Sequence, residues 1–312
     1  MDIKSFTFNQ LPLWTDDFFF FQPQGEELVI CNPQTAVCHS PVFLRSRKTL
    51  EEHIQLVQDR KLKKATIVAE DIHFLVHCPS LEELSVIPSF DAHDFDFSPL
   101  YDMPNLHKLC CETSYGPYQD RVSDVDYSRI IGLTELSVSG PKGHKNVHLV
   151  KGLKSLYLGD KQPVGKTLVG AFDGTALEDL SCVSSTISTL EGIGDAKNLR
   201  KLLLAFNYRL RDISDLLSVK DSLTSLEIEN CGKIKDFSVL AHLHKLEKLR
   251  LLGSNEIADF SFVQNMPNLQ EFVCTMKSVS GDVSMCLPIP YVHIQNRRHY
   301  NYKDEDFQKG RC

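Results

Sequence analysis

One spacing of apolar residues recurs through most of the chain: an apolar side chain stands at positions one, four and six of a short segment, with mostly polar side chains between. The clear copies begin at Leu81, Leu106, Leu133, Leu153, Leu177, Leu199, Leu223, Leu246 and Leu269. Weaker copies begin at Leu62 and Ile289, so the series makes ten steps of about 23 residues each. A period of this length is typical of a stacked array of repeats.

The spacing inside each copy predicts a short β-strand. Because side chains alternate along a strand, positions four and six point to one side, and positions three, five and seven point to the other. A single copy cannot bury its own leucines, so neighbouring copies must stack. We therefore predict an α/β solenoid: a leucine-rich-repeat arc with a parallel sheet on the concave side, short 3₁₀ or helical turns on the convex side, and about 11 repeats.

A second motif recurs on the predicted return path. Its copies are Asp96-Phe97-Ser98, Asp212-Ile213-Ser214, Asp236-Phe237-Ser238 and Asp259-Phe260-Ser261. The aspartate or serine can cap a short helical turn, and the central apolar residue can fill the space between neighbouring turns. Together with the repeat length, this motif resembles the internalin-like class of bacterial leucine-rich-repeat proteins over residues 62–294. The resemblance implies a fold, while the members of that class bind many different partners.

The sequence departs from that class in two ways. Asn207 fills the consensus asparagine position, but Ser185, Cys231, Ser254 and Lys277 fill it in other repeats, which predicts an incomplete asparagine ladder. Exported internalins also carry a signal peptide and a surface anchor, and neither pattern occurs in this sequence. We therefore do not expect the cell-surface adhesion role of those relatives.

Three segments are expected along the chain. Residues 1–61 form an N-terminal cap, residues 62–294 form the solenoid, and residues 295–312 form a C-terminal cap and a solvated tail. Within the first cap, the pattern predicts strands over 18–30 and 37–44, separated by a turn at 32–34, and a helix over 50–60 that begins with a capping-box sequence. The loops 112–128 and 140–146 break the repeat period, and the first is a candidate recognition loop.

Composition narrows the range of functions. The formal net charge is −7 and no basic patch occurs, which argues against nucleic acid or an anionic membrane as partner and favours a protein partner with basic groups. The ten cysteines show no paired framework and are expected to be reduced, cytoplasmic thiols. No metal-ligand spacing, phosphate loop or nucleophile motif occurs. We expect no enzyme activity, cofactor or metal.

The outward strand positions predict the functional surface. Near the middle of the array they carry apolar and aromatic groups close to charged ones, as at protein interfaces. The candidate partner-binding residues are Tyr157, Val183, Leu203, Glu227, Glu229, Lys248, Arg250 and Leu252. The hypothesis is a bacterial, cytoplasmic, non-catalytic protein binder, monomeric before binding, in its most concrete form an immunity protein that neutralises a toxin. The alternative is an adaptor or targeting subunit that scaffolds another enzyme.

Overall fold

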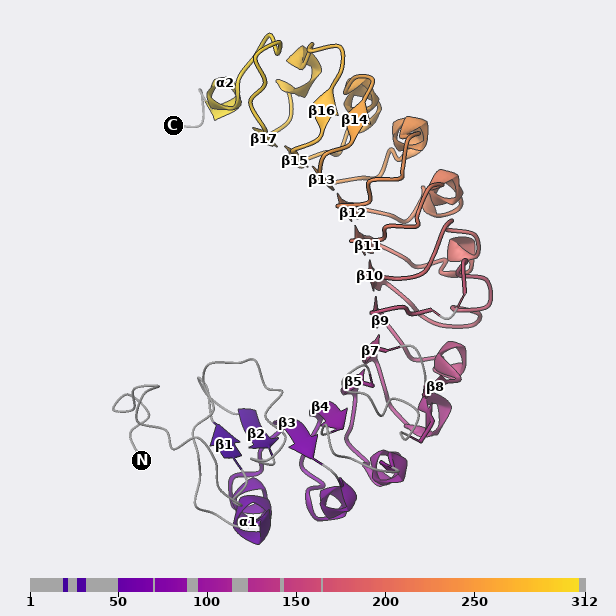
Figure 1. Ribbon diagram of the computed structural model, residues 1–312, viewed down its shortest axis with the longest axis vertical. Coiled ribbons are helices and arrows are strands. Elements are labelled where there is room, and N and C mark those ends of the chain that lie inside the picture. Colours follow the sequence, from indigo (N-terminus) through magenta and orange to yellow (C-terminus); the bar gives the residue numbers. More distant parts are fainter. Residues whose placement is uncertain are drawn as a thin grey trace, which may run out of the picture. The chain divides into compact units, whose positions relative to one another are not determined.

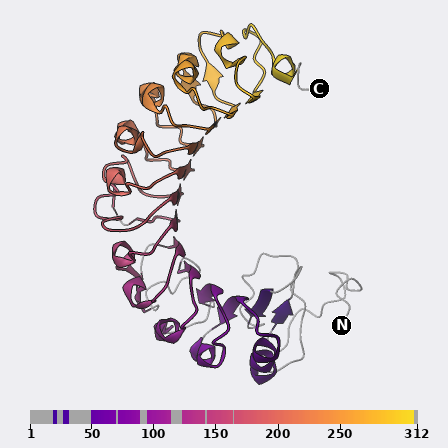
Figure 2. The same cartoon turned by 180° about the vertical axis from the view of Figure 1, so that it is seen from behind.

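The computed structural model describes residues 19–21, 27–31, 50–69, 71–88, 95–113, 123–140, 143–163 and 165–308. The chain forms two compact units, Met1–Gly152 and Leu153–Cys312. Within each unit, short strands follow one another in sequence order on one side, and 3₁₀ helices follow one another on the other side (Figure 1). The view from behind shows the same two rows in each unit (Figure 2). Each unit is therefore a leucine-rich-repeat solenoid.

The described residues of the first unit form one long sheet, one short sheet and one α-helix. The long sheet runs in the order β1 (Phe19–Phe21), β2 (Glu27–Cys31), β3 (Lys64–Ala69), β4 (Glu83–Pro88), β5 (Lys108–Glu112) and β7 (Glu135–Ser139). The short sheet pairs β6 (Val125–Asp126) with β8 (His144–Lys145). The helix is α1 (Leu50–Arg60). All strand pairs are parallel except β1 with β2, which is antiparallel.

The N-terminal part differs from the expectation in one respect. A single strand over 18–30 was predicted, but β1 and β2 are two strands that pair with each other, and β2 also pairs with β3. The sequence between them contains Pro23 and Gly25, which disfavour a continuous strand. The predicted helix is confirmed as α1. The predicted turn at 32–34 and strand over 37–44 lie outside the described residues.

The second unit repeats the arrangement with greater regularity. Its long sheet consists of β9 (Ser155–Gly159), β10 (Asp179–Val183), β11 (Lys201–Ala205), β12 (Ser225–Glu229), β13 (Lys248–Leu252), β15 (Glu271–Cys274) and β17 (Tyr291–Ile294). A short sheet pairs β14 (Glu256–Ile257) with β16 (Lys277–Ser278). The chain continues into α2 (Asp304–Gln308). Every strand pair in this unit is parallel.

The buried positions confirm the repeat register. In the copy that begins at Leu223, the side chains of Leu223, Leu226 and Ile228 are at most 1% exposed. The parallel pairing places Leu226 directly between Leu202 and Leu249, so equivalent leucines of adjacent repeats form a continuous core. Since each strand is only about five residues long, most of the stabilisation must come from this stacking between repeats.

The aspartate–serine motif lies at the start of six of the 3₁₀ helices in the described ranges. In the repeat after β13, the Asp259 carboxylate accepts a hydrogen bond of 2.7 Å from the backbone N–H of Ser261, and Phe260 between them is fully buried. The same hydrogen bond, from a serine N–H to the aspartate two residues earlier, is accepted by Asp96, Asp126, Asp212, Asp236 and Asp282. The 3₁₀ helices are His73–His77, Ser98–Asp102, Tyr127–Arg129, Val147–Leu149, Ile193–Asp195, Ser214–Val219, Ser238–His242, Ser261–Asn265 and Ser284–Cys286.

The asparagine position needs one correction. Asn207 bridges repeats as expected: its Oδ1 accepts from the backbone N–H of Ser185 at 2.9 Å, and its Nδ2 donates to the Cys182 carbonyl at 2.8 Å. In the repeat of β13 the bridging residue is Asn255, and Ser254 is exposed. The turn after β13 contains Gly253 at φ +137°, and the asparagine follows one residue later than in the repeat of Asn207.

Residues 295–308 of the predicted C-terminal segment contact the last repeats. The Asp304 carboxylate at the start of α2 accepts a hydrogen bond of 2.9 Å from the backbone N–H of Ile294 in β17, the last strand of the sheet. The Tyr300 hydroxyl accepts from the backbone N–H of Ser278 at 2.7 Å, and Phe307 is buried. These aromatic side chains explain the contacts, because they supply apolar surface that the polar composition of the tail concealed. The segment boundaries at 61 and 294 stay predictions.

A partly buried polar cluster connects the irregular loops of the first unit. The Tyr127 hydroxyl lies 2.8 Å from His144 Nδ1, and His144 Nε2 lies 3.1 Å from the Ser139 carbonyl oxygen. Burial lowers the pKa of His144, so its imidazole is neutral and its Nε2–H is the donor to Ser139. Most of the candidate recognition loop, residues 114–122, lies outside the described residues.

Candidate protein-binding face

The outward side chains of the second unit form rows that cross its strands. The fifth positions of five consecutive strands stand directly opposite one another in the parallel pairing: Tyr157, Ser181, Leu203, Glu227 and Arg250. Adjacent strands lie about 4.8 Å apart, so the Cα atoms of Leu203 and Arg250 are roughly 10 Å apart. One loop of a partner could contact both side chains.

The eight candidate residues fall into two neighbouring groups. Tyr157, Val183 and Leu203 lie on β9 to β11, while the charged residues lie on β12 and β13 beside Leu252. Tyr157 is 36% exposed, whereas Gly159, the next outward residue on β9, is buried. The candidate residues are therefore apolar and aromatic on β9 to β11 and mainly charged on β12 and β13, and the outward face of β10 and β11 also carries the ion pair of Asp179 with Lys201 at 3.8 Å.

Arg250 pairs with two carboxylates on neighbouring strands. Its Nε and Nη2 both lie 2.7 Å from Glu271 Oε1, and its Nη1 lies 4.0 Å from Glu227 Oε2. The hydrogen bond to Glu271, together with the negative charge of both carboxylates, raises the pKa of the Arg250 guanidinium. The guanidinium is therefore held by carboxylates of the two flanking strands, β12 and β15.

Glu271 is a residue of this face that the sequence reasoning missed. Its side chain is only 18% exposed, and it fixes the orientation of Arg250 from β15. The alternation already placed Glu271 outward, and pairing across neighbouring strands would have identified it as the partner of Arg250. Tyr291 stands opposite Glu271 on β17 and is 46% exposed, which adds a second aromatic side chain to the same face.

Two charges of the candidate set have no ion pair among the described residues. The Glu229 carboxylate accepts a hydrogen bond of 3.2 Å from the Asn230 amide, and no lysine or arginine lies within 4 Å of it. Lys248 is exposed and likewise has no carboxylate within 4 Å in the described ranges. These side chains are available to opposite charges of a partner.

Seven thiols whose side chains the structure describes are free, and six of these seven are buried. Cys78, Cys111, Cys182, Cys231, Cys274 and Cys286 are buried, and Cys110 is half-buried. Burial raises the pKa of the Cys182 thiol to about 12, so this thiol is inert at neutral pH. These residues fill the core as small apolar side chains.

The described ranges contain no group of three or more His, Cys, Asp or Glu side chains arranged to hold a metal ion. None of the helices within those ranges has the length and apolar character that a membrane crossing requires.

Comparisons with known proteins bear on the fold. No protein-family model and no curated protein matches the sequence. Among solved structures, an internalin from Listeria monocytogenes is 20% identical with a TM-score of 0.51 and covers 76% of this chain and 69% of its own. Internalin C2 of the same organism is 19% identical with a TM-score of 0.39, covering 59% and 75%. A leucine-rich-repeat protein of Leptospira interrogans is 15% identical with a TM-score of 0.33, covering 76% and 75%.

The likeness to the first of these internalins agrees with the repeat register and with the aspartate–serine turns. The chain is a leucine-rich-repeat protein with an internalin-like fold.

Proposed function

We propose that the outward face of β9 to β13 recognises another protein. The observation that carries this proposal is the row Tyr157, Ser181, Leu203, Glu227 and Arg250, in which aromatic, apolar and charged side chains stand in register on a rigid sheet. Aromatic and arginine side chains dominate the binding energy of protein interfaces. The sheet holds these groups in place before a partner arrives, so little ordering is needed on binding.

The most concrete role that we infer is a bacterial immunity protein, non-catalytic and cytoplasmic, that neutralises a toxin. The net charge of −7 supports a partner with basic groups, because opposite charges accelerate association. Free, buried thiols support a reducing compartment. In this role the protein is monomeric until it binds.

A photo-crosslinking amino acid tests the proposal in the native host. Placed at Ser181, between Tyr157 and Leu203, it is expected to give one discrete protein adduct. The matched control position is Leu217, which is 45% exposed on the 3₁₀ helix Ser214–Val219. Adduct formation at Ser181 is expected to disappear when Tyr157→Ala and Arg250→Ala are combined.

The identity of the adduct then separates the two roles. A toxin whose activity is lost in the complex supports immunity, whereas an enzyme that stays active in the complex supports an adaptor. The same adduct from Ser181 and Leu217, or an adduct at Ser181 that survives the double substitution, would place recognition elsewhere on the chain.

A further inference from the structure

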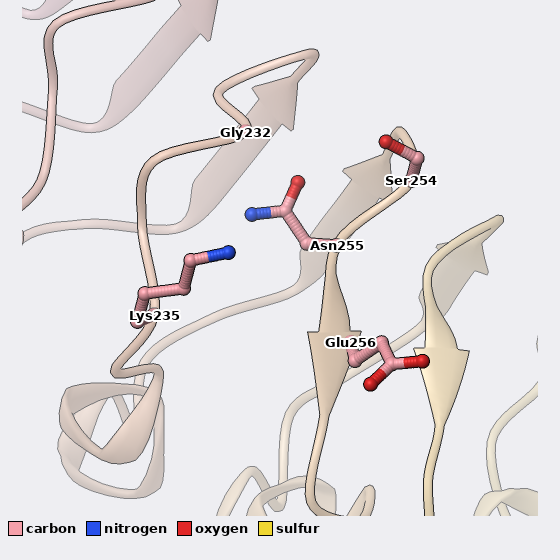
Figure 3. Close-up of a pocket in the computed structure, with 5 residues that line it drawn as sticks. All are labelled: Gly232, Lys235, Ser254, Asn255 and Glu256. Carbon is pink, nitrogen blue, oxygen red and sulfur yellow. The ribbon is translucent and has the colours of Figure 1, made fainter.

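A second candidate site lies away from the outward strand face, in the segments that follow β12 and β13. Gly232, Lys235, Ser254, Asn255 and Glu256 line a half-open pocket of about 440 Å³ (Figure 3). This volume falls in the range of small-ligand sites. All of the lining side chains are polar, so the pocket suits a ligand that is recognised by hydrogen bonds and charge.

Asn255 supplies a buried acceptor that no described residue satisfies. Its Nδ2 donates to the carbonyls of Cys231 at 3.2 Å and Ile234 at 2.9 Å, which fixes the orientation of the carboxamide. Asn255 as a whole is only 5% exposed. Its Oδ1 is fully buried and has no hydrogen-bond partner among the described residues. A buried acceptor of this kind requires a donor from solvent or from a ligand.

Asn207 shows that the missing bond is particular to this site. In that repeat the equivalent Oδ1 accepts from both the backbone N–H and the hydroxyl of Ser185, at 2.9 and 2.6 Å. The later position of Asn255 in its own turn aims both of its amide hydrogens at backbone carbonyls instead. The Oδ1 of Asn255, a residue that lines the pocket, is consequently left without a donor among the described residues.

Lys235 and Ser254 offer donors around the Asn255 carboxamide, with the Lys235 ammonium at its nitrogen end (Figure 3). Both side chains point toward the carboxamide of Asn255, from opposite sides of the pocket (Figure 3). The Glu256 carboxylate points the other way, toward β16, where Lys277 Nζ lies 2.7 Å from it. The hydrogen bond from Lys277, with a smaller effect of the Lys235 charge, lowers the pKa of Glu256, while the ammonium of Lys235 has no carboxylate within 4 Å in the described part of the chain.

These groups define the chemistry of the ligand. It must present an N–H or O–H to Asn255 Oδ1 and, next to it, an anionic oxygen to Lys235, with the Ser254 hydroxyl free to donate to a second oxygen. We propose that the pocket binds an acylated amino-acid carboxylate, the group found at the C-terminus of a peptide. The amide N–H of the ligand meets Asn255, and its carboxylate meets Lys235 and Ser254.

Gly232 allows the pocket to be closed without disturbing the fold. A Cβ atom added at this position meets no atom within 4 Å, and its backbone lies outside the left-handed region. Gly232→Leu is therefore expected to reduce the volume of the pocket that Gly232 lines while leaving the backbone unstrained. Asn255 is unsuitable for this purpose, because its Nδ2 bonds hold two repeats together.

Nuclear magnetic resonance titration of the full chain tests the proposal. The probes are N-acetylglycine, N-acetyl-alanyl-alanine and the C-terminal amide of the latter, and the amide signals of Gly232, Ser254 and Asn255 are followed. We expect saturable shifts with the two acids at a Kd of about 1 mM and at least about tenfold weaker binding of the amide. Equal affinities of the two acids indicate a free small carboxylate as ligand, and tighter binding of the longer acid indicates a peptide C-terminus.

Variants decide whether the shifts report this pocket. Gly232→Leu and Lys235→Ala are expected to weaken binding at least about tenfold, and Lys235→Arg to retain it. Lys233→Ala, which removes an exposed lysine outside the pocket lining, is the matched control and is expected to bind normally. Thermal melts of all variants verify folding. The proposal is overturned if the signals do not move, which would mean that water satisfies Asn255. It is also overturned if the amide binds as tightly as the acids or if Gly232→Leu binds as tightly as the parent.

Discussion

Truncation of a core leucine tests the repeat register quantitatively. Leu226 is 1% exposed and stands between Leu202 and Leu249 of the adjacent strands. Because both neighbouring strands are held by backbone hydrogen bonds, the site cannot collapse around the smaller side chain. We therefore expect Leu226→Ala to cost about 3–5 kcal/mol, the upper part of the range for buried leucines.

The matched control for this substitution is the preceding residue on the same strand. Ser225→Ala changes an outward, half-buried position of β12 and is expected to stay within about 0.5 kcal/mol of the parent. Urea unfolding followed by circular dichroism compares the two midpoints at constant slope. Equal midpoints for Leu226→Ala and Ser225→Ala would refute the reasoning, since a strand shifted by one residue exchanges the two faces.

Three further predictions concern thiols and titrating groups. Alkylation of the folded protein is expected to modify Cys110 faster than any of the six buried thiols of the described part, and mass spectrometry would contradict this if Cys182 reacted as fast. Hydrogen bonds from Ser261 lower the pKa of Asp259, so the ionised Asp259 stabilises the fold fully above about pH 4 and loses this contribution as the pH falls through its folded-state pKa. Asp259→Ala is expected to lower the free energy of unfolding by about 1 kcal/mol at pH 7 and to flatten the acid unfolding curve. Burial lowers the pKa of His144, so the neutral imidazole contributes fully to the stability of the fold above about pH 6.5, and this contribution is lost at lower pH. His144→Gln is therefore expected to reduce the change of the melting temperature between about pH 7.5 and pH 5.5, roughly the range around the ordinary pKa of histidine.

The regular part of the fold could be predicted from the sequence because each repeat carries the same pattern of apolar positions. Positions one, four and six are apolar in every copy, and only a stack of parallel strands buries them all. The aspartate–serine turns were predictable for a related reason, since their hydrogen bonds join residues only two positions apart, as from Asp259 to Ser261.

The features that the sequence concealed depend on contacts between distant residues. Glu271 orients Arg250 across a strand pair, and Tyr300 packs against Ser278 in the preceding coil. Asn255 lies one position beyond the consensus site, where a strict count of residues assigned Ser254. The strand spacing placed the eight candidate binding residues on one face of the second unit, while their contact with a partner stays a prediction.

Arg250 requires a control of its own, because its substitution also releases Glu271. Glu271→Gln removes the internal carboxylate and leaves the guanidinium in place. We expect this variant to bind the partner at least as well as the parent, because the arginine is then free to pair with it. Loss of binding in Glu271→Gln would assign Arg250 a role in shaping the face and would remove it from the direct contacts.

Calorimetric titration of the crosslinked partner, once purified, tests the central claim most directly. Tyr157→Ala and Arg250→Ala are each expected to weaken binding by about 2 kcal/mol, or roughly thirtyfold in Kd, while Leu217→Ala on the opposite side of the second unit binds as the parent does. Near-parental affinity in both face variants would contradict the claim that the row from Tyr157 to Arg250 is the recognition surface.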